Sequence, residues 1–424
     1  MGNLDYTQVL NKIENTRRFG NEPGVVVTAQ VIKVLREKGK QKRIIPYIHV
    51  AGTNGKGSVC AFFSSILKKA HMRVGTFVSP HLVDFEERIT VDGRMIPKED
   101  VTRLGNYLLD IDFGIGLTMF DYCLAMALLY FEEQQCDYMV IETGLGGRLD
   151  STNAIGTPQC AVITKIGYDH MAILGSDIAD IAAEKAGIIK ENGTVVVEQQ
   201  DKRAMQVIEQ EAKKKHARII TVEQSDIARC SGYALRLCGT FQWENAAAAE
   251  LAAQYVLGKR YSGPEYEMQY DKTEPKSEKT DLNDRIKSAL EETVWPGRME
   301  IVSKEPFLLV DGAHNSNGVD ALKESLMQMY PGEKFCFFMG VMADKDYDVM
   351  IREILPLAEE FYTVTPDSDR ALQASHLADF IRKEGVCATE LSGVDEIRKH
   401  LKRDTKNVAF GSLYFIGELK QHRI

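Results

Sequence analysis

Apolar runs alternate with helical patterns along the chain from residue 44 onward. Short apolar runs bounded by polar residues predict buried strands, near 44–50, 74–78, 138–141, 160–166 and 194–197. Apolar positions at helical spacing predict helices, near 59–70, 98–110, 120–134, 178–190 and 202–215. This alternation indicates an α/β fold with a mostly parallel, doubly wound sheet.

A second alternation follows later in the chain. A polar stretch from 258 to 284 has few aliphatic residues and is typical of an insertion or linker, and Trp295-Pro296-Gly297-Arg298 then interrupts the pattern. Further strands are predicted near 306–311, 334–340, 361–365 and 407–411, with helices near 316–329, 346–360, 373–384 and 393–403. We therefore predict a first domain over 1–297, with the insertion inside it, and a smaller α/β domain over 298–424.

Composition excludes several classes of protein. The chain has 424 residues and a net charge of −9, which argues against a general nucleic-acid binder. Its eight cysteines form no CxxC pair, which fits a reducing cytosol, and the longest apolar run, 122–131, is too short to span a bilayer. The first residues do not resemble a signal sequence. We expect a cytoplasmic protein that is not attached to a membrane.

Gly52-Thr53-Asn54-Gly55-Lys56-Gly57-Ser58 lies between a predicted strand and a predicted helix. Glycines let backbone N–H groups converge on an anion, and the helix N-terminus adds partial positive charge. Lys56 can reach outer phosphates, and Ser58 can meet Mg²⁺. The spacing departs from the strict P-loop, and the alternative is an ordinary glycine-rich turn. The pattern favours a nucleoside triphosphate site.

Polar and ionisable side chains also follow other predicted strands. Ser79 follows the strand at 74–78, Glu142 follows 138–141, and Asp169-His170 follows 160–166. Ligands of open parallel sheets collect at the carboxyl ends of strands. These groups could surround a divalent ion that bridges ATP phosphates, Mg²⁺ by its preference for oxygen, with Mn²⁺ as a substitute because a histidine is present. A turn serine and a structural histidine are the alternatives.

The nucleotide is expected to be ATP. In GLGG, residues 144–147, the third glycine of a dinucleotide fingerprint would fall at Leu149, so that fingerprint is absent. The TKIG segment places Gly167 where a guanine-reading motif needs an acid. Adenine is therefore the better expectation.

Lys185 lies on an apolar stripe of the predicted helix 178–190. A lysine there must extend its amine to water, pair with an acid or lose its charge. The sharper alternative is an amine of lowered pKa that takes up CO₂ and becomes an anionic carbamate.

The second predicted domain also presents an acid and an imidazole after a strand, in Asp311-Gly312-Ala313-His314. Arg298 lies just beyond the domain boundary and could close on a phosphate. A plain Asp-Gly turn is the alternative.

Several motifs occur together and in order: GTNGKGS, SPH, GLGGRLDSTN, YDH at 168–170, EKAGIIK, WPGR, DGAHN, DKD at 344–346 and GSLY at 411–414. This set resembles folylpolyglutamate synthase and dihydrofolate synthase, of the Mur ligase family, from about residue 40 to 415. The resemblance implies a large P-loop-type ATPase domain and a smaller Rossmann-like C-terminal domain, with the active site between them.

Residue by residue, the resemblance implies an ATP phosphate loop at Asn54, Gly55, Lys56, Gly57 and Ser58, and Mg²⁺ ligands at Ser79, Glu142 and His170. It implies that Lys185 is carbamylated, that Asn245 and Arg298 contact ATP and its phosphates, that Asp311 contacts the ribose, and that His314 lies near the reacting phosphate. The pterin substrate is expected at Phe120, Asp121, Ser151, Thr152 and Asn153. The family usually has Glu where this chain has Asp121.

The expected activity is an ATP-dependent ligase. A substrate carboxylate attacks the γ-phosphate and gives an acyl phosphate and ADP, and the amine of L-glutamate then displaces phosphate to form an amide. The expected acceptor is a folate or dihydropteroate, and the protein is expected to be a monomer. Two rival readings remain: another Mur-type ligase with a different carboxylate acceptor, and a non-catalytic ATP-dependent switch.

Overall fold

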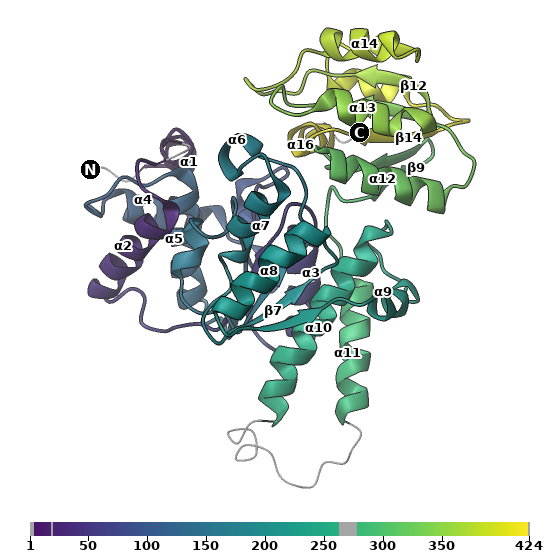
Figure 1. The fold of residues 1–424 in the computed structure, drawn as a ribbon. Coiled ribbons are helices and arrows are strands. Elements are labelled where there is room, and N and C mark those ends of the chain that lie inside the picture. The colour runs from purple at the N-terminus through teal and green to yellow at the C-terminus, as the bar shows by residue number, and fades with distance from the viewer. Residues whose placement is uncertain (1–3, 18–19, 263–277, 423–424) are drawn as a thin grey trace. The chain divides into compact units, whose positions relative to one another are not determined.

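The computed structural model describes residues 4–17, 20–262 and 278–422 (Figure 1). The chain forms two compact units. The first comprises residues 1–81, 85–234 and 244–293, and the second comprises 82–84, 235–243 and 294–424. The predicted polar insertion, 258–284, falls largely outside the described residues; its described ends belong to helices α10 (Phe241–Ser262) and α11 (Glu278–Glu292).

The first unit is built on an eight-stranded sheet in the order β4-β3-β2-β5-β1-β6-β7-β8. The strands are β1 (Tyr47–Ala51), β2 (Val74–Phe77), β3 (Ile89–Val91), β4 (Arg94–Met95), β5 (Tyr138–Glu142), β6 (Cys160–Ile163), β7 (Thr194–Val197) and β8 (Arg218–Thr221). Every pairing is parallel except β2 with β3 and β3 with β4. The predicted mostly parallel, doubly wound sheet is confirmed.

The strand register places the central strand ends at one edge of the sheet. Val50 of β1 pairs with Glu142 of β5, and Ala51 pairs with Ile163 of β6. Because β2, β5, β1 and β6 are consecutive neighbours in the sheet, the loops that follow them emerge side by side. This edge is where an open parallel sheet places its ligand.

Helices cover both faces of this sheet: α1 (Tyr6–Glu14), α2 (Gly24–Glu37), α3 (Lys56–Lys69), α4 (Lys98–Leu109), α5 (Met119–Glu133), α6 (Met171–Leu174), α7 (Ile178–Ala186), α8 (Lys202–Lys214) and α9 (Gln224–Ser231), with α10 and α11. Tyr47 joins a core with α1, α2, α4 and α5, whereas Ala51 joins a core with α7 and α8, which lie side by side (Figure 1). Side chains alternate along a strand, so both cores share one face. Helix α3 packs on the other, where the Ser64 and Thr76 hydroxyls lie 2.7 Å apart.

The second unit has a six-stranded sheet in the order β13-β12-β11-β14-β10-β9. Its strands are β9 (Glu300–Lys304), β10 (Phe307–Val310), β11 (Phe335–Met339), β12 (Ala358–Thr363), β13 (Ala388–Glu390) and β14 (Lys406–Phe410), and only β9 runs antiparallel to its neighbour. Its helices are α12 (Ser316–Met329), α13 (Tyr347–Ile354), α14 (Ala374–Lys383), α15 (Ile397–His400) and α16 (Leu413–Gln421). Phe337 and Phe338 point to opposite faces and anchor separate cores.

The structure corrects some predicted elements. The helix predicted over 346–360 ends at Ile354, because a short 3₁₀ turn that contains Pro356 follows over Leu355–Leu357 and β12 starts at Ala358. The helix predicted over 393–403 is a 3₁₀ turn followed by the short α15. The strands β3, β4, β8, β9 and β13, at or next to the sheet edges, were not predicted, since such short segments carry little periodicity. Among the described residues, no helix combines the length and apolarity that crossing a membrane requires.

Candidate active site

The turn from β1 into α3 has no room for side chains at its glycines. Gly55 is the N-cap of α3 with φ +90°, a left-handed conformation that favours glycine. A Cβ on Gly55 would clash with Oδ1 of Asn245, and a Cβ on Gly52 would clash with Oγ1 of Thr164. The structure therefore brings Asn245, which is buried on α10, to the predicted phosphate loop.

The loop after β6 holds this turn in place. The backbone N–H groups of Thr53 and Asn54 both donate to the carbonyl of Lys165, at 2.9 and 3.2 Å. The Thr164 hydroxyl donates to the carbonyl of Asn54 at 2.6 Å, and Gly167 N–H donates to the Thr53 hydroxyl at 3.0 Å. The conformation of the turn is therefore fixed by a neighbouring strand's loop.

The Lys56 ammonium lies back over its own loop. Its Nζ donates to the carbonyls of Gly52 and Thr53 at 3.2 and 3.1 Å, and lies 3.9 Å from Oε1 of Glu142. Ser58, in the first turn of α3, is buried. An anion in the loop would offer Lys56 a stronger, charged partner than these carbonyls.

The predicted metal ligands lie at neighbouring strand ends. Ser79 N–H donates to Oε2 of Glu142 at 3.1 Å, which joins the loops after β2 and β5. His170 follows β6, caps α6 with φ +52°, and has a 36% exposed side chain 4.0 Å from Asp169 Oδ1. No group of three or more His, Cys, Asp and Glu side chains suited to a metal occurs within the described ranges. The metal role of Ser79, Glu142 and His170 stays a prediction.

Lys185 lies near the C-terminus of α7 and is only 4% exposed. Its Nζ donates to the carbonyl of Gly52 at 2.9 Å, the same carbonyl that Lys56 contacts. Burial, reinforced by the positive charge of Lys56, lowers the pKa of Lys185 to about 7. A large share of this side chain is therefore a neutral, nucleophilic amine at neutral pH.

The residues predicted to hold the pterin are engaged with one another. Asp121 is 2% exposed, and its carboxylate accepts from Thr118 N–H at 2.8 Å, from the Thr118 hydroxyl at 2.7 Å and from the Ser151 hydroxyl at 2.6 Å. Asp121 and Thr118 thus form the capping box of α5. The Phe120 ring packs edge-on against Phe77, with ring centroids 5.5 Å apart. A pterin role for these residues stays a prediction.

Thr152 and Asn153 are also held internally. The Thr152 hydroxyl donates to Asp150 Oδ1 and lies 2.8 Å from His49 Nε2. Asn153 Nδ2 donates to the carbonyls of Arg148 and Gly187, at 3.0 and 3.1 Å. Asp150, which the sequence reasoning missed, also accepts from Leu145 N–H at 2.8 Å and so fixes the GLGG loop. Its position directly before Ser-Thr-Asn was the available signal, because Asp commonly caps such turns.

In the second unit, the carboxyl end of β10 carries the predicted polar group. Asp311 is buried and accepts from the N–H groups of Met299 and Ala313, both at 2.8 Å. Burial raises the pKa of Asp311, and the nearby charge of Arg298 opposes that shift. The Arg298 guanidinium covers Gly312, where a Cβ would lie 2.7 Å from Nη1. His314 Nδ1 donates to the carbonyl of Gly312 at 2.8 Å, which orients the ring.

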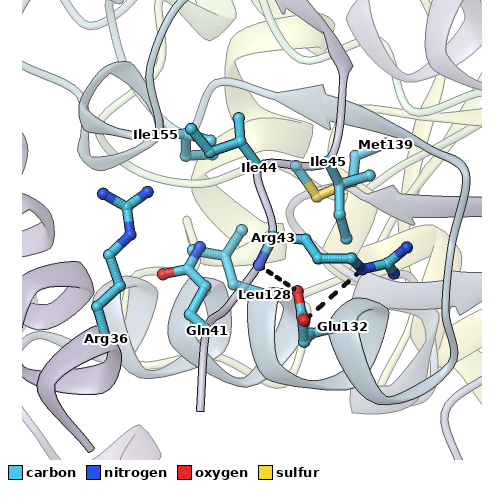
Figure 2. A pocket seen from close by; sticks show the side chains of 9 residues that line it. All are labelled: Arg36, Gln41, Arg43, Ile44, Ile45, Leu128, Glu132, Met139 and Ile155. Atoms are coloured by element: carbon cyan, nitrogen blue, oxygen red, sulfur yellow. Dashed lines mark hydrogen bonds and ion pairs between the residues drawn. The ribbon is translucent and has the colours of Figure 1, made fainter. Parts of the chain in front are cut away.

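A small hollow elsewhere in the first unit does not belong to this site (Figure 2). Ile44 and Ile45 precede β1 and Met139 lies early in β5, so the hollow is at the amino ends of these strands. Arg43 N–H donates to Glu132 Oε2 at 3.4 Å beside it. The space of about 10 Å³ holds a single water at most.

Comparison with known protein families gives two matches. Residues 50–253 match the Mur ligase middle domain, and residues 297–411 match the Mur ligase glutamate ligase domain. The first match includes the predicted phosphate loop, Lys185 and Asn245, and the second includes Asp311.

Individual relatives match over nearly their whole length. The chain is 33% identical to a Bacillus subtilis dihydrofolate synthase/folylpolyglutamate synthase, over 98% of each protein, and 30% identical to a Lacticaseibacillus casei folylpolyglutamate synthase, over 87% of each. The solved structure of E. coli FolC in complex with DHPP and ADP is similar with a TM-score of 0.80 at 26% identity, covering 99% of this chain and 97% of that one. A Thermotoga maritima folylpolyglutamate synthase structure gives 0.77 at 28% identity, covering 98% and 96%.

Gly55→Ala should abolish binding at the predicted phosphate loop, because it adds both backbone strain of about 1–2 kcal/mol and a clash with Asn245. Titration calorimetry with ADP measures the effect. The matched control is Gly385→Ala, which has the same φ of +90° but no heavy atom within 4 Å of the added Cβ. If both variants bind ADP equally well, the loop does not need the space at Gly55.

Proposed function

The chain belongs to the Mur ligase family, in its folylpolyglutamate synthase and dihydrofolate synthase group, and we propose that it is an ATP-dependent ligase that adds L-glutamate to a folate. The observation that carries the proposal is the meeting of Lys56, Lys185 and Glu142 at the Gly52–Ser58 loop. A phosphate-binding turn needs a cation to receive the anion and an acid beside it to orient a metal.

The loop's own groups would bind ATP. The N-terminus of α3 would offer backbone N–H groups to the phosphates, and Asn245 lies directly beside Gly55, the N-cap of this helix. Lys56 then exchanges the carbonyls of Gly52 and Thr53 for phosphate oxygens.

The oxygen donors at this edge fit Mg²⁺. The Glu142 carboxylate accepts from Ser79 N–H and would offer the ion an oxygen, and the hydroxyls of Ser79, after β2, and of Ser58, in the first turn of α3, would offer others. We propose that Ser79, Glu142 and His170 hold the ion, with Mn²⁺ as a substitute. When bound, the ion neutralises phosphate charge during phosphoryl transfer.

The reaction needs positioning and charge neutralisation more than a side-chain nucleophile. The folate carboxylate attacks the γ-phosphorus and ADP leaves, and the glutamate amine then attacks the acyl carbon and expels phosphate. Lys56 stabilises the phosphate charge, and we assign Arg298 the same task, Asp311 a ribose contact and His314 a place near the reacting phosphate. Expectations of a cytoplasmic monomer that binds no nucleic acid stay predictions.

For Lys185 we propose the carbamate. Its neutral amine attacks the carbon of CO₂, an N–C bond forms and one proton leaves, so the side chain becomes an anion. Lys56, whose charge disfavours an ammonium at Lys185, favours this anion for the same reason. The result is a negative group next to the proposed metal site.

ADP release with different acceptor substrates tests the proposed function directly. ADP release in the presence of glutamate should be observed with tetrahydrofolate, and dihydropteroate should be a second, weaker acceptor because Asp121 is shorter than the usual Glu and is held by Thr118 and Ser151. Omitting glutamate is the control. Activity with dihydropteroate alone would overturn the preference, and activity with neither would point to the rival Mur-type acceptor.

Lys185→Ala should lower activity by about 100-fold or more, because an electrostatic group next to the reacting phosphates is lost. Added acetate should restore part of it by supplying an anion. In the wild type, activity should fall as the pH falls below about 7, since protonation removes the amine that binds CO₂. ¹³C NMR with labelled CO₂ provides the direct measurement, and an active enzyme without a carbamate signal would contradict the proposal.

Glu142→Gln should lower activity by about 10- to 100-fold and raise the Mg²⁺ concentration needed for half-maximal rate, because a neutral amide binds the ion less well. Steady-state rates at increasing Mg²⁺ measure this shift. Glu191→Gln, at an exposed position, is the control. An unchanged Mg²⁺ requirement in Glu142→Gln would remove Glu142 from the metal site.

A further inference from the structure

The segment directly after β7, Glu198-Gln199-Gln200, hydrogen-bonds to the backbone of the loop after β6. Glu198 Oε2 accepts from Lys165 N–H at 2.7 Å, and Gln200 Oε1 accepts from Ile166 N–H at 2.9 Å. Gln200 Nε2 donates to the carbonyl of Thr164 at 3.0 Å. Two side chains thus bind three consecutive residues, where the strands β6 and β7 have already ended.

Lys165 links this segment to the phosphate loop. Its N–H is held by Glu198, and its carbonyl accepts from both Thr53 and Asn54. The N–H of Lys165 therefore contacts Glu198, and the carbonyl of the same residue contacts the phosphate loop. A shift of Lys165 would move the acceptor on which two successive N–H groups of the phosphate loop depend.

We propose that Glu198 is a positioning residue for ATP binding: it fixes the phosphate loop through Lys165, with Gln200 as a second support. The inference rests on the proposed role of Gly52–Ser58 in holding ATP. Glu198 itself reaches no ligand, because it is 1% exposed.

The surroundings of Glu198 indicate which property of the side chain matters. Glu244 accepts from Gln199 N–H at 2.7 Å and lies 3.9 Å from Lys165 Nζ, so a second carboxylate and one ammonium face Glu198. Burial, reinforced by the charge of Glu244, raises the pKa of Glu198 well above its usual range. Oε1 is buried and has no hydrogen-bond partner among the described residues. A neutral acid that accepts through Oε2 fits this site, and glutamine can reproduce that acceptor.

The test compares three variants. Glu198→Ala should raise the Kd for ADP and the KM for ATP by about tenfold, the effect of losing one supporting hydrogen bond, while the KM for glutamate changes by less than about threefold. Glu198→Gln should bind ADP as the wild type does. Glu209→Ala, at an exposed position on α8, is the control and should change none of these constants.

A second readout uses pH. The buried neutral acid contributes stability that is present below the unfolded pKa of about 4.3 and is lost as the pH rises through its higher folded pKa. The thermal midpoint of the wild type should therefore fall relative to that of Glu198→Gln as the pH rises above about 4.3, the pKa of glutamate in the unfolded chain.

The possible results distinguish failure of the positioning role of Glu198 from failure of the proposed ligase function. An unchanged ADP Kd in Glu198→Ala would overturn the positioning role. So would an increase in the KM for glutamate as large as the increase in the KM for ATP. If Glu198→Ala does not fold, Gln200→Ala, which is half-buried, should raise the ADP Kd, and failure to do so also overturns it. Calorimetry with ADP needs no acceptor, so a wild type that binds ADP but uses no folate would refute only the proposed function.

Discussion

The absence of space at the turn between β1 and α3 is the constraint on which the rest of the site depends. Asn245 lies against Gly55 and Thr164 lies against Gly52, so the backbone of the turn is enclosed by side chains from α10 and from the loop after β6. This packing leaves the Gly52 carbonyl as the acceptor of two lysines. A side chain at either glycine would disturb the backbone, both lysine contacts and the position of Glu142 relative to Lys56.

The two lysines at this turn, Lys56 and Lys185, lie in different electrostatic surroundings. Lys56 lies near Glu142, which lowers the cost of its charge, whereas Lys185 is buried and its Nζ donates to the Gly52 carbonyl. Burial and the charge of Lys56 consequently lower the pKa of Lys185 to about 7. The same packing that fixes the backbone of the turn thereby makes this amine easier to deprotonate.

The sequence anticipated the site unevenly, for physical reasons. Lys185 on an apolar stripe is buried, and the glycine turn lies where the strand-turn-helix pattern placed it. The family resemblance implies a pterin contact for Asp121, whose carboxylate in the structure caps α5 through Thr118 and accepts from Ser151, a residue 30 positions away in the chain. Glu198 also follows a predicted strand, yet nothing in the local sequence indicates that it reaches Lys165.

By itself, the sequence determined the longer buried strands, many of the helices between them and the mostly parallel sheet, because these follow from local periodicity and from the alternation of elements. It also determined that polar or ionisable residues directly follow several of the strands. Only the tertiary structure decided the strand order, which makes β2, β5, β1 and β6 neighbours, and the side chains that fill the space around Gly52 and Gly55. These depend on contacts between segments that are far apart in the sequence, as between Thr53 and Gly167 (separation 114), which local patterns do not encode.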